Sequence, residues 1–288
     1  MEFPVRTGAP KSQKTACAIL PIFEGRTLKG ASHKIDSSCG KILSKLIRTS
    51  SSYGKLGQTL LIPQIKGIAA EKILLVGCGK ETDFNAKALS QAVSASIAAL
   101  SKVGLREATS YLAYSSIQDI DEYYKARLTA EAAQSALYRF DEIKSHTSRQ
   151  TKITRLGIAV DALTKAKEAR RGVSHGQAIS SGMNIARDLS NRPPNICTPS
   201  HLATESQEIA KTFDNLTTKV LAEKDMERLG MGALLSVTRG AKEPAKFIIM
   251  EYKGASSNEA PIVLCGKGIT FDTGGISLKP PSKMDEMK

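Results

Sequence analysis

The sequence predicts an α/β protein with two domains. The chain has 288 residues, a length at which single hydrophobic cores usually stop growing, so two domains are expected. Short apolar runs alternate with longer segments in which alanine and leucine recur at helical spacing, a pattern typical of a mostly parallel sheet covered by helices. The Pro193-Pro194 pair ends a long alanine-rich helical segment and separates two such regions.

The elements of the first region follow from local patterns. Lys72 to Gly77 is a continuous apolar run ended by glycine, which predicts a buried parallel strand. Residues 83–102 show helical spacing, with Asp83 as the expected N-cap and Gly104 just past the end. Further strands are expected at residues 16–20, 59–62, 109–113 and 155–160, and a further helix at 126–140.

In the second region, a long helix over 162–189 is expected to connect the domains. Thr198 and Pro199 then open another helix that runs through Lys211. Strands are predicted at residues 217–221, 247–252 and 261–265. The expected boundaries are 1–161 for the first domain, 162–190 for the connecting helix and 191–288 for the second domain. With few strands and no closing helix, the second domain is expected to be incomplete.

Composition argues against several classes of protein. No apolar run reaches 18 residues, the minimum for a transmembrane helix, and the N-terminus lacks the basic and apolar regions of a secretory signal. A cytoplasmic protein is therefore expected. The five cysteines never form a Cys-x-x-Cys pair, and the four histidines share no short ligand spacing. Any metal is expected to bind oxygen or amine ligands.

The net charge of +13 is unevenly distributed, since residues 1–70 hold 11 Lys and Arg against 3 Asp and Glu. A field of this sign attracts polyanions through counterion release, which makes nucleic acid a candidate partner of the N-terminal part. A solvated basic surface that maintains solubility explains the same charge. No interleaved aromatic residues suggest a base-stacking platform. Both interpretations stay open.

The segment Gly77-Cys78-Gly79-Lys80 has the composition of a phosphate-binding loop. Its spacing does not fit, because a Walker loop needs a glycine five residues before Gly79 and a serine or threonine after the lysine, where this chain has Leu74 and Glu81. Thr82 likewise breaks the dinucleotide-binding pattern. A tight turn between a strand and a helix is the expected role.

The densest group of reactive side chains follows the strand predicted at 261–265. Such a strand would bring Lys267 to the carboxyl end of a sheet, where open α/β proteins place ligands. Gly274-Gly275 lets the backbone fold back, which aims Lys279 at the region of Asp272. A lysine binds a divalent cation only as the neutral amine, which metal and partial burial both favour. The alternative is a surface ion pair between Lys267 and Asp272 beside an ordinary turn.

The segment Gly266 to Lys279, Gly-Lys-Gly-Ile-Thr-Phe-Asp-Thr-Gly-Gly-Ile-Ser-Leu-Lys, closely resembles a signature of the leucyl aminopeptidases, peptidase family M17. Other segments resemble the same family: Asn184 to Asn195, Met231 to Val237 with Arg239-Gly240, Glu251 to Gly254 and, more loosely, Leu75 to Lys80. The resemblance implies an N-terminal macro-like α/β domain and a C-terminal α/β/α metallopeptidase domain.

The resemblance also implies roles for three residues. Lys267 would bind one of two divalent metal ions, Mn²⁺ or Zn²⁺, Asp272 would bridge or contact both, and Lys279 would be the catalytic lysine that polarises the scissile carbonyl. Two metals generate hydroxide near neutral pH, and a fixed cation stabilises the developing negative charge. The implied activity is removal of N-terminal residues, preferably leucine-like, from peptides. The family further implies a homo-hexamer and a bicarbonate site, and some members act on DNA.

The chain departs from the family pattern in its remaining ligands. By the family spacing, the next aspartate ligand falls just past Lys288, and the later segment that supplies the other carboxylates is absent from these residues. Two ligands cannot hold two cations. The sequence therefore predicts a truncated family member that is inactive alone.

Overall fold

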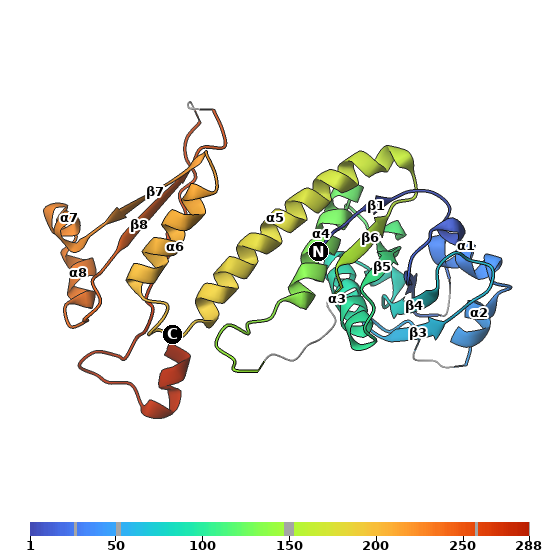
Figure 1. The fold of residues 1–288 in the computed structure, drawn as a ribbon, viewed down its shortest axis with the longest axis horizontal. Coiled ribbons are helices and arrows are strands. Elements are labelled where there is room, and N and C mark those ends of the chain that lie inside the picture. Colours follow the sequence, from blue (N-terminus) through green and yellow to red (C-terminus); the bar gives the residue numbers. More distant parts are fainter. Residues whose placement is uncertain (26–27, 50–52, 147–152, 257–258, 288) are drawn as a thin grey trace. The chain divides into compact units, whose positions relative to one another are not determined.

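The structure is a computed structural model that describes residues 1–25, 28–49, 53–146, 153–256 and 259–287. The chain divides into two compact units, Met1–Ile185 and Ala186–Lys288. Both units combine helices with strands, so the predicted α/β class is confirmed (Figure 1). Among the described helices, none has the length and apolar character needed to cross a membrane.

The first unit is built on a six-stranded sheet with the strand order β1-β6-β5-β2-β4-β3. All neighbouring pairs are parallel except β3 with β4. The central strand β2 is buried along its whole length, as expected for a parallel strand covered on both faces. The strands are β1 (Val5–Arg6), β2 (Ala18–Ile22), β3 (Thr59–Pro63), β4 (Lys72–Gly77), β5 (Glu107–Ser110) and β6 (Arg155–Ala159).

Helices cover both faces of this sheet (Figure 1). Alternate residues of β4 point to opposite faces. Leu74 therefore joins the apolar cluster formed with α3, α4 and the first part of α5, whereas Leu75 joins the cluster formed with α1 and α2. The helices are α1 (Gly30–Ser38), α2 (Ile42–Ile47), α3 (Ala86–Lys102), α4 (Glu122–Leu137) and α5 (Ala166–Asn191).

The ends of several elements differ from the prediction. Helix α3 is capped by Asn85, whose side chain accepts a hydrogen bond from the Ala88 N–H at 3.1 Å, so the prediction of Asp83 as the cap is wrong. Asp121 caps α4, which therefore begins before the predicted start. The strand predicted at 109–113 ends at Ser110. In each case the predicted end is displaced because neighbouring residues are equally suited to cap or to end the element, and the local sequence pattern does not distinguish between them.

Helix α5 approaches α4 closely at two glycines. A Cβ atom on Gly172 would lie 2.1 Å from the carbonyl oxygen of Tyr123, and one on Gly176 would lie 2.6 Å from that of Arg127. The two glycines are four residues apart and so share one face of the helix. This close approach places the Tyr123 hydroxyl 2.8 Å from Nδ1 of His175. The packing of the long helix on its unit therefore depends on the absence of side chains at these positions.

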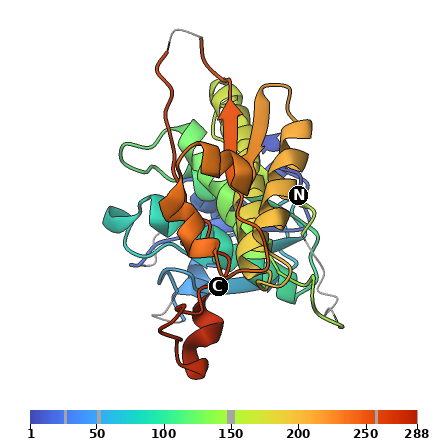
Figure 2. The same ribbon diagram turned by 90° about the vertical axis from the view of Figure 1, so that its left-hand side faces the viewer.

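The second unit contains an antiparallel pair of strands, β7 (Leu216–Leu221) and β8 (Phe247–Tyr252) (Figures 1 and 2). The preceding helix α6 (Pro199–Lys211) begins as predicted, with Thr198 as N-cap and proline in its first turn. It packs on β7, where the Thr218 hydroxyl donates to the carbonyl oxygen of Ser206 at 3.0 Å. The connection between the strands holds α7 (Glu223–Arg228) and α8 (Gly232–Thr238).

Gly172→Ala should destabilise the first unit by about 2 kcal/mol, because the added methyl group forces two packed helices apart. Gly182→Ala is the matched control, since it lies in the same helix and a Cβ there meets nothing within 4 Å. This control should stabilise the unit by about 1 kcal/mol through helix propensity. Urea unfolding followed by circular dichroism measures both, and effects of equal sign and size would contradict the glycine packing.

Candidate metal-binding and catalytic loop

A loop near the end of the chain brings Asp272 and Lys279 together. The Nζ atom of Lys279 lies 2.8 Å from Oδ2 of Asp272. The backbone N–H of Gly274 donates to the other carboxylate oxygen, Oδ1, at 2.9 Å. Both carboxylate oxygens are therefore engaged by donors of the same loop.

Glycine allows this loop to close. Gly274 and Gly275 have φ angles of +89° and +65°, in the region that other residues rarely adopt. A Cβ atom on Gly274 would also lie 2.3 Å from the carbonyl oxygen of Ser277. The Lys279 N–H donates to the carbonyl oxygen of Thr273 at 2.9 Å and so fixes the returning backbone. The structure thus brings Lys279 to Asp272, as the glycine pair predicts.

The surrounding donors and charges keep Asp272 ionised. The hydrogen bond from Lys279 holds the pKa of the Asp272 carboxyl below its usual value, and the Gly274 N–H and the charges of Lys279 and Lys267 act in the same direction. The Asp272 side chain is 48% exposed and that of Lys279 is 30% exposed. The loop therefore presents an ionised carboxylate that solvent ions can reach.

The third predicted residue, Lys267, precedes the loop in exposed backbone outside any helix or strand. Its charge contributes to the lowered pKa of Asp272. The ion pair that the sequence suggested between Lys267 and Asp272 forms instead, in the described structure, between Lys279 and Asp272. The Gly274 donor was not predicted, although an aspartate that accepts a hydrogen bond from the N–H two residues later forms an Asx-turn, a common local structure.

The strand predicted at 261–265 is wrong. Ile262, Val263 and Leu264 form no strand, and they expose 92%, 80% and 92% of their surface. A strand needs a neighbour that satisfies its backbone N–H and C=O groups, and none of the described strands pairs with this segment. The apolar pattern correctly signals side chains suited to burial. It does not supply the neighbouring strand, so no sheet edge positions Lys267 in this structure.

The donor chemistry of the loop fits part of a metal site. Carboxylate oxygen is a ligand type that divalent cations accept, and a lysine nitrogen can serve only after it loses its proton; Asp272 and Lys267 are the residues of these two types here. Within the described ranges, no group of three or more His, Cys, Asp and Glu residues could hold a metal ion. Even zinc usually takes four ligands. Two such residues would fill at most two coordination positions, so a cation bound here would need further donors.

The other sequence segment with a ligand-like pattern, Gly77 to Lys80, is a structural connection. Its N–H groups bind backbone within the fold: Gly77 donates to Gln58 at 2.8 Å, Cys78 to Ile22 at 2.9 Å and Gly79 to Gly54 at 2.8 Å. Donors already used in this way cannot hold a phosphate. A Cβ on Gly77 would lie 1.9 Å from the carbonyl oxygen of Lys55, which explains the glycine. The segment links β4 to a short 3₁₀ helix at Glu81–Asp83, so its role is structural, although residues 78–80 do not form the tight turn that was predicted.

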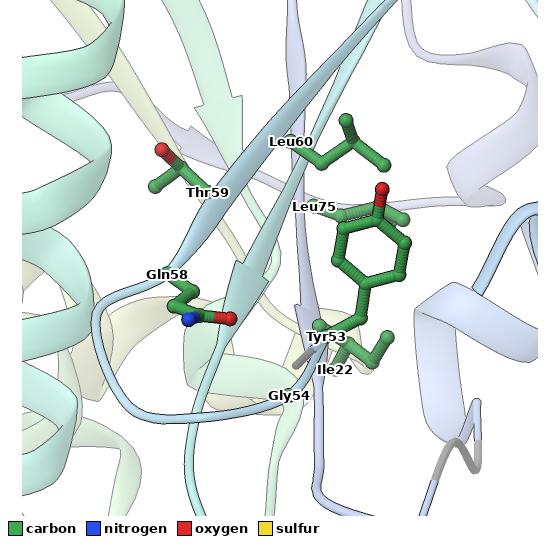
Figure 3. A pocket seen from close by; sticks show the side chains of 7 residues that line it. All are labelled: Ile22, Tyr53, Gly54, Gln58, Thr59, Leu60 and Leu75. Atoms are coloured by element: carbon green, nitrogen blue, oxygen red, sulfur yellow. The ribbon is translucent and has the colours of Figure 1, made fainter. Parts of the chain in front are cut away.

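A small cavity lies beside this segment (Figure 3). Its volume is about 10 Å³, close to the minimum that holds one water molecule. Its lining is mostly apolar and consists of Ile22, Tyr53, Gly54, Gln58, Thr59, Leu60 and Leu75. The cavity is too small for an organic ligand, so it offers no binding site for one.

Comparison with known proteins agrees with the pattern of the loop. The sequence model described as the cytosol aminopeptidase family, catalytic domain, matches residues 184–288, and the one described as the N-terminal domain of the same family matches residues 19–147. The probable cytosol aminopeptidase of Nitrosococcus oceani is 42% identical over 289 residues, and that of Idiomarina loihiensis is 40% identical over 289 residues. Each comparison covers 100% of this chain and 58% of the relative.

Solved structures show the same similarity. The bottromycin maturation enzyme BotP, in complex with Mn, has a TM-score of 0.72 and 27% identity, with coverage of 95% of this chain and 52% of that chain. Two consecutive domain matches thus define a peptidase architecture. The chain belongs to the cytosol aminopeptidase family, peptidase family M17, and it spans about 58% of the length of the curated relatives it matches.

Proposed function

We propose that this chain is part of a metal-dependent aminopeptidase, in which Lys267 and Asp272 bind divalent metal and Lys279 is the catalytic lysine. The observation that carries the proposal is the contact of 2.8 Å between Lys279 and Asp272, which brings an ionised carboxylate and a lysine ammonium group together in one exposed loop. Family membership and the manganese complex of BotP support the assignment.

Each residue has a distinct task in this proposal. A bound divalent cation would supply a Lewis acid for water and carbonyl and an anchor for the free amino terminus of the peptide. Asp272 contributes an ionised carboxylate to hold the cation, and Lys267 contributes its neutral amine. The ammonium group of Lys279 stabilises the negative charge that develops on the carbonyl oxygen in the transition state. These tasks correspond to hydrolysis at the N-terminus of a peptide.

Finer properties are proposed from the family resemblance. They are a leucine-like preference, two metal ions that are Mn²⁺ or Zn²⁺, a bicarbonate site, a cytoplasmic location and a homo-hexamer. Apolar side chains beside the loop support the preference, since Ile269 and Phe271 are 39% and 38% exposed. We place the catalytic part from residue 191 onward, after a connecting helix over 162–190 and a first domain over 1–161; the family match begins at 184.

Nucleic-acid binding through the basic N-terminal part stays a second candidate. A surface hollow of about 370 Å³ lies between the N-terminal segment and α1. Lys11, His33 and Lys34 are among its lining residues, and no carboxylate is. A basic hollow of this kind suits phosphate groups. Nucleic-acid binding by the N-terminal part, which the net charge suggests, therefore stays a prediction.

The 288-residue chain should not hydrolyse leucine amide with added Mn²⁺ or Zn²⁺, because two donors cannot hold two cations. The same chain fused to the remaining C-terminal residues of the Nitrosococcus oceani relative should hydrolyse it, and Asp272→Asn in that longer protein should abolish the activity. Release of leucine is the measurement. Turnover by the 288 residues alone would contradict the predicted inactivity, and a folded but inactive longer protein would contradict the aminopeptidase proposal.

In the longer protein, Lys279→Ala should lower kcat by about 10²-fold to 10³-fold with little change in KM, because its charge acts on the transition state. Lys283→Ala removes the same charge from an exposed neighbouring residue and should leave both constants near those of the unmodified protein. Steady-state kinetics with leucine amide decide the matter. A change in KM alone would show that Lys279 contributes only to substrate binding.

A further inference from the structure

We propose that Lys279 is the counter-ion of Asp272 when no metal is bound, and that it leaves Oδ2 when a divalent cation binds the carboxylate. The inference rests on the proposed function, because it concerns the same metal-binding residue. Its consequence is regulatory. The catalytic lysine is held on its own loop until the site is loaded, and loading the site releases it toward the substrate.

Both oxygens of the Asp272 carboxylate are occupied by donors. Oδ1 of Asp272 accepts from the Gly274 N–H at 2.9 Å, and Oδ2 lies 2.8 Å from Nζ of Lys279. The Gly274 donor is part of the backbone and cannot withdraw without opening the turn. The Lys279 donor stands at the end of a flexible side chain. A cation that competes for Asp272 therefore displaces Lys279.

Charge repulsion also favours the departure of Lys279. Lys279 carries one positive charge, and the charge of Lys267 also acts on Asp272. A divalent cation on the same carboxylate would repel an ammonium group that stayed in contact with it, and the repulsion grows as the two approach. Movement of Lys279 away from Oδ2 relieves this repulsion. Replacement of the Lys279 ammonium group by the metal ion is thus favoured over binding of both to Asp272.

Both partners of the ion pair are accessible to solvent. The Asp272 side chain is 48% exposed and the Lys279 side chain is 30% exposed. Ion pairs at such exposure contribute little free energy, because water competes for both partners. A cation held by several ligands therefore outweighs this exposed contact. The pair is therefore weak enough to yield to a cation.

Release of Lys279 requires no refolding of the loop. The Lys279 N–H remains bound to the carbonyl oxygen of Thr273 at 2.9 Å, which anchors the backbone of the lysine. Gly274 and Gly275 have positive φ angles that glycine adopts at little cost, so the turn does not need the ion pair to hold them. The side chain of Lys279 can therefore swing by rotation about its own bonds. The loop keeps its shape while the ammonium group changes partner.

Acylation of lysine amines, read residue by residue by mass spectrometry, tests the proposal. In the metal-free 288-residue chain, Asp272→Ala should raise the acylation rate of Lys279 about fivefold, since it removes the contact that shields the amine. The rate at Lys283, exposed on the following segment, is the internal control and should not change. In the longer protein, added Mn²⁺ should raise the rate at Lys279 by a similar factor without any substitution.

Calorimetric titration of Mn²⁺ into the longer protein distinguishes failure of the proposed release of Lys279 from failure of the proposed metal site. An unchanged Lys279 rate in Asp272→Ala overturns the counter-ion role. Binding of Mn²⁺ that Asp272→Ala abolishes, together with a Lys279 rate insensitive to Mn²⁺, overturns the release while the proposed function stands. Absence of Mn²⁺ binding overturns the proposed metal site and, with it, the release.

Discussion

A backbone turn at Gly274 is the constraint on which the candidate site depends. Its φ of +89° suits glycine, and a side chain there would meet the carbonyl oxygen of Ser277 at 2.3 Å. The turn has two effects at once. It points the Gly274 N–H at one oxygen of Asp272 and returns Lys279 to the other. One backbone conformation therefore sets the ionisation of the carboxylate and the position of the lysine.

The first unit uses glycine in a related way but for packing. Gly77 lets the segment that carries Lys55 lie against the end of β4, and Gly172 lets α5 lie against α4. In both places backbone meets backbone at distances that exclude a Cβ atom. The backbone donors of the Gly77 segment are used within the fold. Glycine thus permits close packing in the first unit and the closure of a charged loop in the second.

The sequence alone predicts an element correctly where the residue pattern is compatible with only one type of secondary structure and one pair of ends. The strands at Lys72–Gly77 and Phe247–Tyr252 are confirmed at both ends, because each is an apolar β-rich run. Prediction fails where two neighbours compete, as with Asp83 and Asn85 at the start of α3. It also fails at 261–265, because burial needs a partner that residue order does not identify.

In the candidate site, too, some features are predictable from the sequence and others are not. The residue types and the glycine turn were readable from the sequence, and so was the return of Lys279. The partner of Asp272 was not, since Lys267 and Lys279 flank it at similar separations and only the loop conformation decides between them. The chemical roles rest on family membership, which two domain matches establish.

The contact between Lys279 and Asp272 is measured most directly by ¹H–¹⁵N correlation NMR of the lysine side-chain ammonium groups, at low temperature and without metal. A Lys279 ammonium held at 2.8 Å from Asp272 should give a signal with slowed hydrogen exchange. Gly274→Ala should abolish that signal, because it opens the turn. A protected Lys279 signal that survives in Gly274→Ala, or its absence from the folded unmodified chain, would contradict the dependence of the site on this turn.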